Sequence, residues 1–305
     1  MSDNPPAYKS GFVAIAGRPN VGKSTLMNVF LGQKVAAISP RPQTTRRRQL
    51  GILTLENAQV IFIDTPGIHA ARHKLGEFMN DDAATALKDA DVVLWMVDSS
   101  VMPTEEDEIV ARRIQETVDP AKVIVVLNKI DRIPAAQIPE YEIAYGYLLS
   151  QAQVIPVSAL NAANLDGLLN AILERLPPGE PLYDPEQITD LYEREIAADL
   201  LRESALQHLR EEVPHAIAVR IDEYTERGDS GAFIAATLIV EKESQKGIVI
   251  GRQGEMLKKI STAARLNIEQ MSGRKVYLEV RVKVNKNWRS DPNALRLLGF
   301  APKKN

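Results

Sequence analysis

The chain has 305 residues, of which 45% are hydrophobic and 25% charged, a balance typical of a globular protein long enough for two domains. Disordered and fibrous proteins are therefore excluded. It contains no cysteine, which rules out disulfides and cysteine-based metal sites. The longest apolar runs are far too short to span a bilayer, and the first residues lack the pattern of a secretory leader, so we expect a cytoplasmic protein.

The net charge of −3 conceals an uneven distribution along the chain. Residues 244–305 carry 14 Lys and Arg against 4 Asp and Glu, whereas the residues before them are acidic overall. A basic segment is often only a solvated surface. So local an excess nevertheless suggests an anionic partner for the C-terminal part.

The first 176 residues alternate short apolar runs with longer amphipathic segments. The expected strands are 12–17, 59–67, 91–100, 122–131 and 153–160, and the expected helices include 105–118 and 164–176. Apolar strands that alternate with helices predict an α/β domain with a mainly parallel sheet and helices on both faces. Ligands of such a sheet bind beyond the carboxyl ends of its strands.

A glycine loop follows the first expected strand and opens a helix. The segment GRPNVGKS at 17–24 matches G-x-x-x-x-G-K-[ST], whose backbone N–H groups and helix N-terminus surround a β-phosphate. Lys23 would bridge the β- and γ-phosphates, and the Ser24 hydroxyl would bind Mg²⁺. A glycine turn without a ligand is the alternative, and the motifs that follow argue against it.

The segment NKID, at the end of a later strand, predicts that the bound base is guanine. The Asp131 carboxylate can accept from both N1–H and N2–H of guanine, whereas adenine offers no such pair of donors. Asn128 would hold the edge of the base, and Lys129 would pack along the ring and the phosphate loop. The Ala159 N–H of the segment SAL could reach guanine O6.

The segment DTPG supplies the contacts that depend on the γ-phosphate. Asp64 would reach Mg²⁺ through water, and the Gly67 N–H can bind the γ-phosphate only while that phosphate exists. The polar segment 39–49 lies between the two phosphate motifs. Either Thr44 or Thr45 would close over Mg²⁺, and we favour Thr45.

The predicted nucleotide-binding residues come from four segments of the chain. They are Gly17, Arg18, Pro19, Asn20, Val21, Gly22, Lys23, Ser24, Thr25, Asp64, Thr65, Pro66, Gly67, Asn128, Lys129, Asp131, Ser158, Ala159 and Leu160. The Mg²⁺ ligands among the predicted residues are Ser24, Thr45 and Asp64.

The organisation of the chain changes after residue 176. The proline-rich segment 177–190 is predicted to be a linker. Residues 191–305 then give a helix, two strands, two helices and a strand, which predicts a smaller α+β domain with helices on one face of a three-stranded sheet and with a basic C-terminal tail.

A second glycine loop, GRQG, joins the two helices of this smaller domain. A tight turn between helices would explain a lone G-x-x-G equally well. Here the loop contains Arg252, and Lys258 and Lys259 follow on the next helix, so we predict that the loop binds an RNA backbone. The predicted RNA-binding residues are Gly251, Arg252, Gln253, Gly254, Lys258 and Lys259.

The ordered set RPNVGKST, PQTTRRR, DTPGIH and NKID resembles the Era family of GTPases, and the resemblance extends over nearly the whole chain. It implies a P-loop GTPase domain at 1–176 and a type II KH RNA-binding domain at 191–305, with GTP or GDP and Mg²⁺ as ligands. The implied RNA is the 3′ end of small-subunit ribosomal RNA, and the implied role is assembly of the 30S subunit. We expect a monomer, and peripheral association with a membrane is left open.

The resemblance also bears on catalysis. Ile68 occupies the position at which Ras-like enzymes place a glutamine that orients water, so hydrolysis should be slow or assisted. The resemblance implies that Asn20 helps to hold a K⁺ ion beside the phosphates. The catalytic residues are then predicted to be Lys23, Thr45, Asp64, Gly67 and Asn20.

Two other functions are compatible with parts of this pattern. The chain could be a constitutive RNA-binding protein with a vestigial GTPase domain, but the intact phosphate, metal and guanine motifs argue against it. It could be a metabolic kinase, but NKID and the lack of residues that would activate an acceptor make that interpretation weaker.

Overall fold

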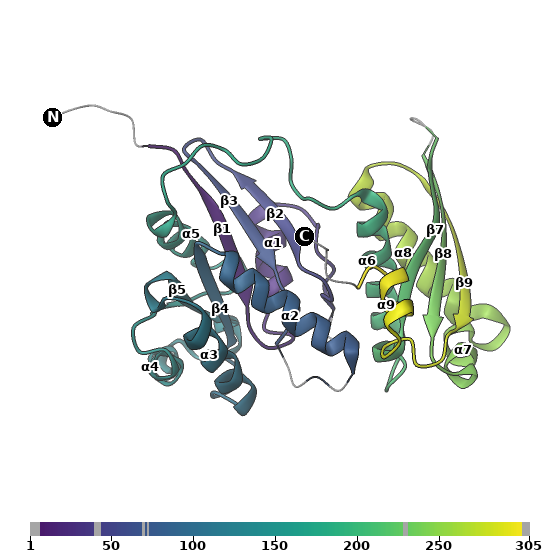
Figure 1. The fold of residues 1–305 in the computed structure, drawn as a ribbon, viewed down its shortest axis with the longest axis horizontal. Coiled ribbons are helices and arrows are strands. Elements are labelled where there is room, and N and C mark those ends of the chain that lie inside the picture. The colour runs from purple at the N-terminus through teal and green to yellow at the C-terminus, as the bar shows by residue number, and fades with distance from the viewer. Residues whose placement is uncertain (1–6, 40–43, 69–70, 72, 228–230, 301–305) are drawn as a thin grey trace. The chain divides into compact units, whose positions relative to one another are not determined.

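The computed structural model describes residues 7–39, 44–68, 71, 73–227 and 231–300. The chain divides into two compact units (Figure 1). The first unit comprises 1–34, 45–70 and 79–190, and the second comprises 35–44, 71–78 and 191–305. The last residues of the predicted basic tail, 301–305, lie outside the described residues.

The first unit is built on a six-stranded sheet in the order β2-β3-β1-β4-β5-β6. All neighbouring strands are parallel except β2 and β3. The strands are β1 Lys9–Ala16, β2 Gln49–Thr54, β3 Ala58–Asp64, β4 Val92–Asp98, β5 Val123–Asn128 and β6 Gln153–Pro156. The predicted α/β fold with a mainly parallel sheet is therefore confirmed.

Helices cover both faces of this sheet. They are α1 Lys23–Leu31, α2 Lys74–Asp89, α3 Glu105–Thr117, α4 Ile138–Leu148 and α5 Leu165–Arg175. Trp95 on β4 belongs to a buried cluster with residues of α2, α3 and α4. Its neighbour Leu94 points to the opposite face and is also fully buried, as are Leu26 of α1 and Ile172 of α5. Strands β3, β4 and β5 are buried along their whole length, which explains their continuous apolar sequences.

Strand β2 is the element of this sheet that the sequence did not predict. It pairs with β3 in antiparallel register, with Gln49 opposite Asp64 and Thr54 opposite Gln59. The pairing places the residues that follow Thr45 beside the strand that ends in the DTPG segment.

The residues predicted as a linker lie within the first unit, along β2 and β3. The fully buried side-chain amide of Gln59 donates to the Tyr183 carbonyl at 2.9 Å and accepts from the Tyr183 N–H at 2.9 Å. The Ile52 N–H of β2 donates to the Ile188 carbonyl at 2.8 Å. The proline-rich segment is thus fixed by hydrogen bonds over most of its length.

The second unit contains a three-stranded sheet in the order β7-β8-β9, with β7 antiparallel and β9 parallel to β8. Its strands are β7 Ala218–Glu226, β8 Ala232–Val240 and β9 Val276–Val284. Its helices are α6 Glu193–His208, α7 Glu243–Ile250, α8 Glu255–Ser272 and α9 Pro292–Leu297. The order of the elements through β9 is the predicted α-β-β-α-α-β.

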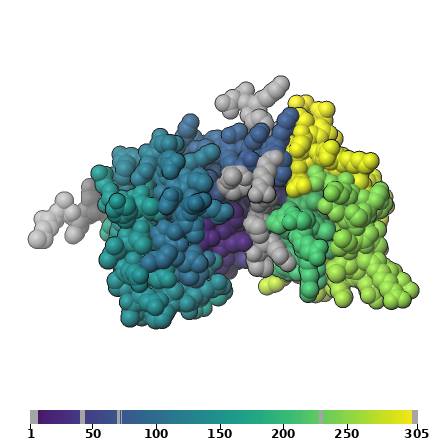
Figure 2. All heavy atoms as spheres, turned by 90° about the horizontal axis from the view of Figure 1, so that it is seen from below, coloured from purple at the N-terminus to yellow at the C-terminus, as the bar shows by residue number. Residues whose placement is uncertain are grey.

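One face of the small sheet carries the core of the second unit. Leu238 of β8 belongs to a buried cluster with Leu201 of α6, Val249 of α7 and Ile260 of α8. Helices α6, α7 and α8 therefore pack on the same face of this sheet. The helices and the sheet of this unit are drawn in Figure 1. In the space-filling view, the lime-green segment that contains α7 and α8 and the yellow segment that contains α9 both reach the surface of this unit (Figure 2). Among the described residues, every helix is too short or too polar to cross a lipid bilayer.

Candidate functional site

The first glycine loop connects β1 to α1 in an unusual backbone conformation. Gly17, Asn20 and Gly22 have φ angles of 151°, 65° and 106°, in the left-handed region that most residues avoid. A Cβ on Gly22 would lie 2.3 Å from the amide nitrogen of Asn128, so only glycine fits there. The loop thus leads directly into the N-terminus of α1, where the helix dipole and free N–H groups favour an anion.

Lys23 begins α1, and its side chain folds back over the glycine loop. Its ammonium group donates to the carbonyls of Gly17 at 3.1 Å and Arg18 at 2.9 Å. Burial lowers the pKa of Lys23 to about 8, although nearby Asp64 acts in the opposite direction. A buried ammonium that lacks a full counter-charge would gain strongly from an anionic phosphate.

Three hydroxyl and carboxylate groups meet beside this lysine. The Ser24 hydroxyl donates to Asp64 Oδ2 at 2.7 Å, and the Thr45 hydroxyl donates to the same oxygen at 3.0 Å. The two hydroxyl oxygens lie 3.1 Å apart. Oxygen ligands of this kind suit Mg²⁺, which usually takes few protein ligands and completes its shell with phosphate oxygens and water. Thr45, the threonine that the sequence analysis favours, makes this hydrogen bond to Asp64.

No group of three or more His, Asp or Glu side chains able to hold a metal by themselves occurs in the part of the chain that the structure describes. Two hydroxyls and one carboxylate are few ligands, which suits a metal ion that completes its shell with the phosphate oxygens of a nucleotide. This is the arrangement that the sequence predicts for Ser24, Thr45 and Asp64.

The guanine motif is linked to the glycine loop by Asn128. Its side-chain amide donates to the Val21 carbonyl at 2.7 Å, and its side-chain oxygen accepts from the Ala159 N–H at 2.9 Å. The Ser158 hydroxyl donates to the exposed carboxylate of Asp131. Asp131 is thereby oriented at the ends of β5 and β6, and further acceptor sites on its carboxylate stay available.

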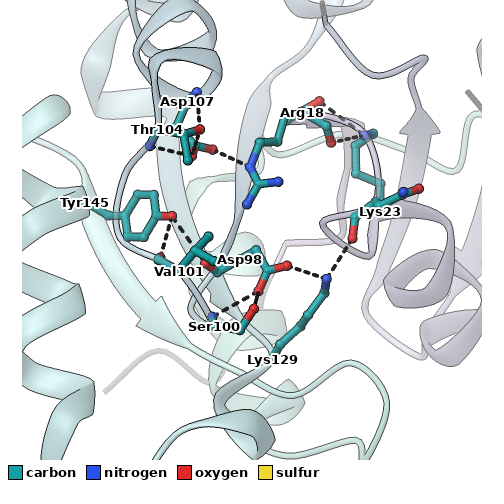
Figure 3. A network of polar contacts seen from close by, with 11 residues as sticks. Arg18, Lys23, Asp98, Ser100, Val101, Thr104, Asp107, Lys129 and Tyr145 are labelled. Carbon is teal, nitrogen blue, oxygen red and sulfur yellow. Dashed lines mark hydrogen bonds and ion pairs between the residues drawn. The ribbon is translucent and has the colours of Figure 1, made fainter. Parts of the chain in front are cut away.

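Lys129 connects the guanine motif to both the glycine loop and β4. Its ammonium group donates to the Asn20 carbonyl at 2.8 Å and pairs with Asp98 at the end of β4 (Figure 3). Tyr145 of α4 donates to the carbonyls of Asp98 and Val101 and so fixes the segment that follows β4. The sequence analysis did not identify Asp98. Its position at the carboxyl end of a parallel strand was the signal that could have revealed it.

Arg18 makes an ion pair on the other side of the glycine loop. Its Nε donates to Asp107 Oδ1 at 3.1 Å, and the Asp107 side chain is fully buried (Figure 3). Asp107 lies in the first turn of α3, where it forms a capping box with Thr104. The sequence analysis did not identify Asp107, although the spacing T-x-x-D is a known mark of a helix start.

The DTPG segment lies against the glycine loop. The Ile68 N–H donates to the Gly17 carbonyl at 3.3 Å, and a Cβ on Gly67 would lie 2.8 Å from the nitrogen of Pro19. Ile68 itself is buried in the hydrophobic cluster and is 2% exposed, so its side chain cannot approach an attacking water. The Thr65 hydroxyl donates to a buried carbonyl of β1 and serves the fold.

The second glycine loop lies between α7 and α8 and is exposed. Gly251, Gln253 and Gly254 have φ angles of 73°, 52° and 82°. A Cβ on Gly251 would lie 2.7 Å from the Met256 side chain, whereas a Cβ on Gly254 would meet open space. The backbone of the loop can thus be approached closely from outside. The side chains of Arg252, Gln253, Lys258 and Lys259 are all exposed around it.

The two predicted sites therefore occupy separate units. The nucleotide residues gather at the carboxyl ends of β1, β3, β5 and β6 in the first unit. Leu160 is 72% exposed at the edge of that group, and Thr25 continues α1. The predicted RNA-binding residues all lie on the α7–α8 segment of the second unit.

Known proteins share both the sequence motifs and the arrangement of this chain. Residues 12–129 match the family described as 50S ribosome-binding GTPase, and residues 212–289 match the KH domain. The GTPase Era of Geobacter metallireducens is 44% identical over 302 residues, which cover 98% of this chain and all of the relative. That of Caldicellulosiruptor saccharolyticus is 45% identical over 298 residues, covering 96% and 98%. The chain belongs to the Era family of GTPases.

Solved structures of Era agree with this assignment. A complex of Era with MgGDPNP and nucleotides 1506–1542 of 16S ribosomal RNA is 44% identical to this chain, with a TM-score of 0.91 and coverage of 96% and 99%. A single-residue variant of Aquifex aeolicus Era bound to GDP and AlF4⁻ is 43% identical with the same TM-score and coverage. As a GTPase of the Era family, the chain binds GTP and hydrolyses it to GDP and phosphate, and its second unit contains a KH domain.

Proposed function

We propose that this GTPase is a molecular switch that binds the 3′ end of small-subunit ribosomal RNA and acts in assembly of the 30S subunit. The observation that carries the proposal is the exposed GRQG loop with its surrounding cations in a KH domain. The Era complex that contains the 3′ region of 16S ribosomal RNA supports it, since this chain is 44% identical to that protein. We further propose a cytoplasmic monomer.

The proposal assigns the chain to functional segments. Residues 1–176 form the GTPase domain, 177–190 the connecting segment and 191–305 the RNA-binding domain. The hydrogen bond between the connecting segment and β2 supports a link to the nucleotide site, because β2 begins four residues after Thr45. RNA affinity should then differ between the GTP and GDP states.

The proposal also assigns roles at the nucleotide. The glycine loop and Lys23 bind the β- and γ-phosphates, and Asp131 selects guanine. Ser24, Thr45 and Asp64 would hold Mg²⁺, which would offset charge on the phosphate oxygens. Gly67 would donate its N–H to the γ-phosphate. The hydrogen bonds from Ser24 and Thr45 to Asp64 support the metal-binding role, and the bond from Ser158 to Asp131 supports the guanine-binding role.

Hydrolysis should be slow in the isolated protein, on the order of 10⁻⁴ to 10⁻² s⁻¹ as in GTPases without a complete catalytic set. The buried Ile68 supports this, because it leaves no side chain at that position to orient water. We propose that K⁺, held with the help of Asn20, assists in place of the missing group.

Single-turnover hydrolysis of GTP, measured with and without small ribosomal subunits, tests this function. The proposal predicts slow hydrolysis alone and a changed rate with subunits. A protein with a vestigial GTPase domain would bind RNA without hydrolysing GTP, and a metabolic kinase would respond to a small acceptor but not to subunits. Either of those results would contradict the proposal.

A further inference from the structure

An ion pair joins the start of the phosphate loop to α3, and none of the expected contacts with the nucleotide requires this pair. Arg18 Nε donates to Asp107 Oδ1 at 3.1 Å, and the two side chains are 17% and 0% exposed. The guanidinium group points toward the start of α3 and away from Lys23 (Figure 3). A charge-assisted hydrogen bond that is shielded from water is strong. Loss of Arg18 would leave the buried Asp107 carboxylate without its counter-charge.

Asp107 is a rigid anchor for this bond. Its second carboxylate oxygen accepts from the Thr104 N–H at 3.0 Å and from the Thr104 hydroxyl at 2.7 Å. The Thr104 hydroxyl in turn caps the Asp107 N–H and begins α3. Every oxygen of the Asp107 carboxylate is therefore engaged, and the carboxylate cannot rotate without breaking the start of the helix.

Arg18, whose side chain is held by Asp107, also orients Lys23 through its main-chain carbonyl. The Arg18 carbonyl accepts from Lys23 Nζ at 2.9 Å, next to the Gly17 carbonyl at 3.1 Å. Gly17 and Asn20, which flank this turn, have positive φ angles, which glycine and asparagine adopt more readily than other residues. The ion pair of Arg18 adds a contact that holds the turn from outside the loop.

We infer that Arg18 is a positioning residue for phosphate binding, acting through Asp107 rather than by its guanidinium group touching the nucleotide. The pair fixes the entry of the loop against α3. The N–H groups of the loop and the Lys23 ammonium are then held in position before the β-phosphate binds. Binding therefore costs little conformational entropy in the loop. Asn128 and Lys129 hold the opposite side of the same loop through the Val21 and Asn20 carbonyls.

The test measures GDP and GMP affinity of the full chain by competition with a fluorescent guanine nucleotide. Arg18→Met keeps the length of the side chain and removes its charge, and Asp107→Asn keeps an acceptor for Thr104. Each variant should weaken GDP binding by at least about tenfold. GMP lacks the β-phosphate, so its affinity should change by less than about threefold. Arg281→Met, which removes an exposed ion pair of the second unit, is the matched control and should leave both affinities unchanged.

Two further variants separate positioning from general damage. The double variant Arg18→Met with Asp107→Asn should bind GDP no more weakly than either single variant, because all three lose the same interaction. Arg18→Lys keeps one donor and should restore most of the GDP affinity. Equal losses for GDP and GMP, or losses that multiply in the double variant, would overturn the inference. GDP binding by the unchanged chain in the same assay tests the GTPase assignment separately.

Discussion

Replacement of Asn128 should strongly destabilise the nucleotide site, because its buried side chain links the end of β5 to the glycine loop and to the SAL segment. Its side chain is 2% exposed, donates to the Val21 carbonyl at 2.7 Å and accepts from the Ala159 N–H at 2.9 Å. Val21 and Ala159 are themselves buried. Replacement by alanine therefore leaves a carbonyl and an N–H group without a partner and without access to water.

The expected cost follows from these two groups. Each buried polar group left unpaired costs about 1–3 kcal/mol, so Asn128→Ala should lower the free energy of unfolding of the first unit by about 2–6 kcal/mol. For a unit of this size that corresponds to a fall in melting temperature of roughly 4–24 °C. GDP affinity should fall as well, since the loop loses a contact that holds it.

Calorimetry of the full chain measures this cost. The transition of the first unit is the one that shifts upward when GDP is added, because ligand binding stabilises the unit that binds it. Gln115→Ala is the matched control, because it removes an amide-to-carbonyl bond of 2.9 Å to Leu148 that is exposed to solvent. The control should cost about 0.5–1.5 kcal/mol at most. Equal shifts for the two variants would refute the argument from burial.

Three further results are expected at the nucleotide site. Asp131→Asn should weaken GDP binding by about a hundredfold or more and admit XDP, and unchanged GDP affinity would refute the guanine assignment. Hydrolysis of GTP should be faster in K⁺ than in Na⁺, and Asn20→Ala should remove this difference. Equal rates of the unchanged chain in the two salts would contradict the potassium proposal. Burial alone would raise the pKa of Asp98, but hydrogen bonds from Lys129 and Ser100 outweigh it and hold that pKa below its usual value of 3.8. A lowered carboxyl pKa stabilises the fold above the unfolded pKa and loses that contribution as the pH falls below it, so Asp98→Asn should reduce the pH dependence of the GDP-sensitive melting temperature below about pH 4. The same dependence in both proteins would contradict this.

Most of the fold was predictable because its central strands are buried on both faces. Such strands have continuous apolar sequences, as β3, β4 and β5 do. Strand β2 lies at the edge of the sheet, and its short segment gave no comparable signal. The short helix α9 was also missed, although Asp291 caps it and Pro292 begins it, which are ordinary marks of a helix start.

The site was predictable where residues act through local motifs, and not where partners lie far apart in sequence. Lys23 and Asp131 could be assigned because their neighbours define the loop that holds them. The partner of Arg18 lies 89 residues away, and that of Lys129 lies 31 residues away. No spacing rule connects such pairs, because they meet only after the parallel strands align their carboxyl ends. The second compact unit likewise combines 191–305 with 35–44 and 71–78, which lie far from it in the sequence.

The central claim is that the Gly251–Gly254 loop binds RNA in a protein that binds guanine nucleotide elsewhere. Arg252→Asp together with Gln253→Asp changes the charge of an exposed turn by about three and keeps both glycines, so RNA phosphates should be repelled while the fold is retained. Ala121→Asp together with Lys122→Asp makes the same charge change on an exposed turn of the first unit and serves as the matched control. Fluorescence anisotropy of a short RNA from the 3′ end of 16S ribosomal RNA, at two salt concentrations, should show a loss of at least about a hundredfold and a weaker salt dependence for the loop variant alone, with GDP affinity unchanged in both. If the loop variant binds RNA as tightly as the control, the basic C-terminal surface binds it without the loop, and the claim is wrong.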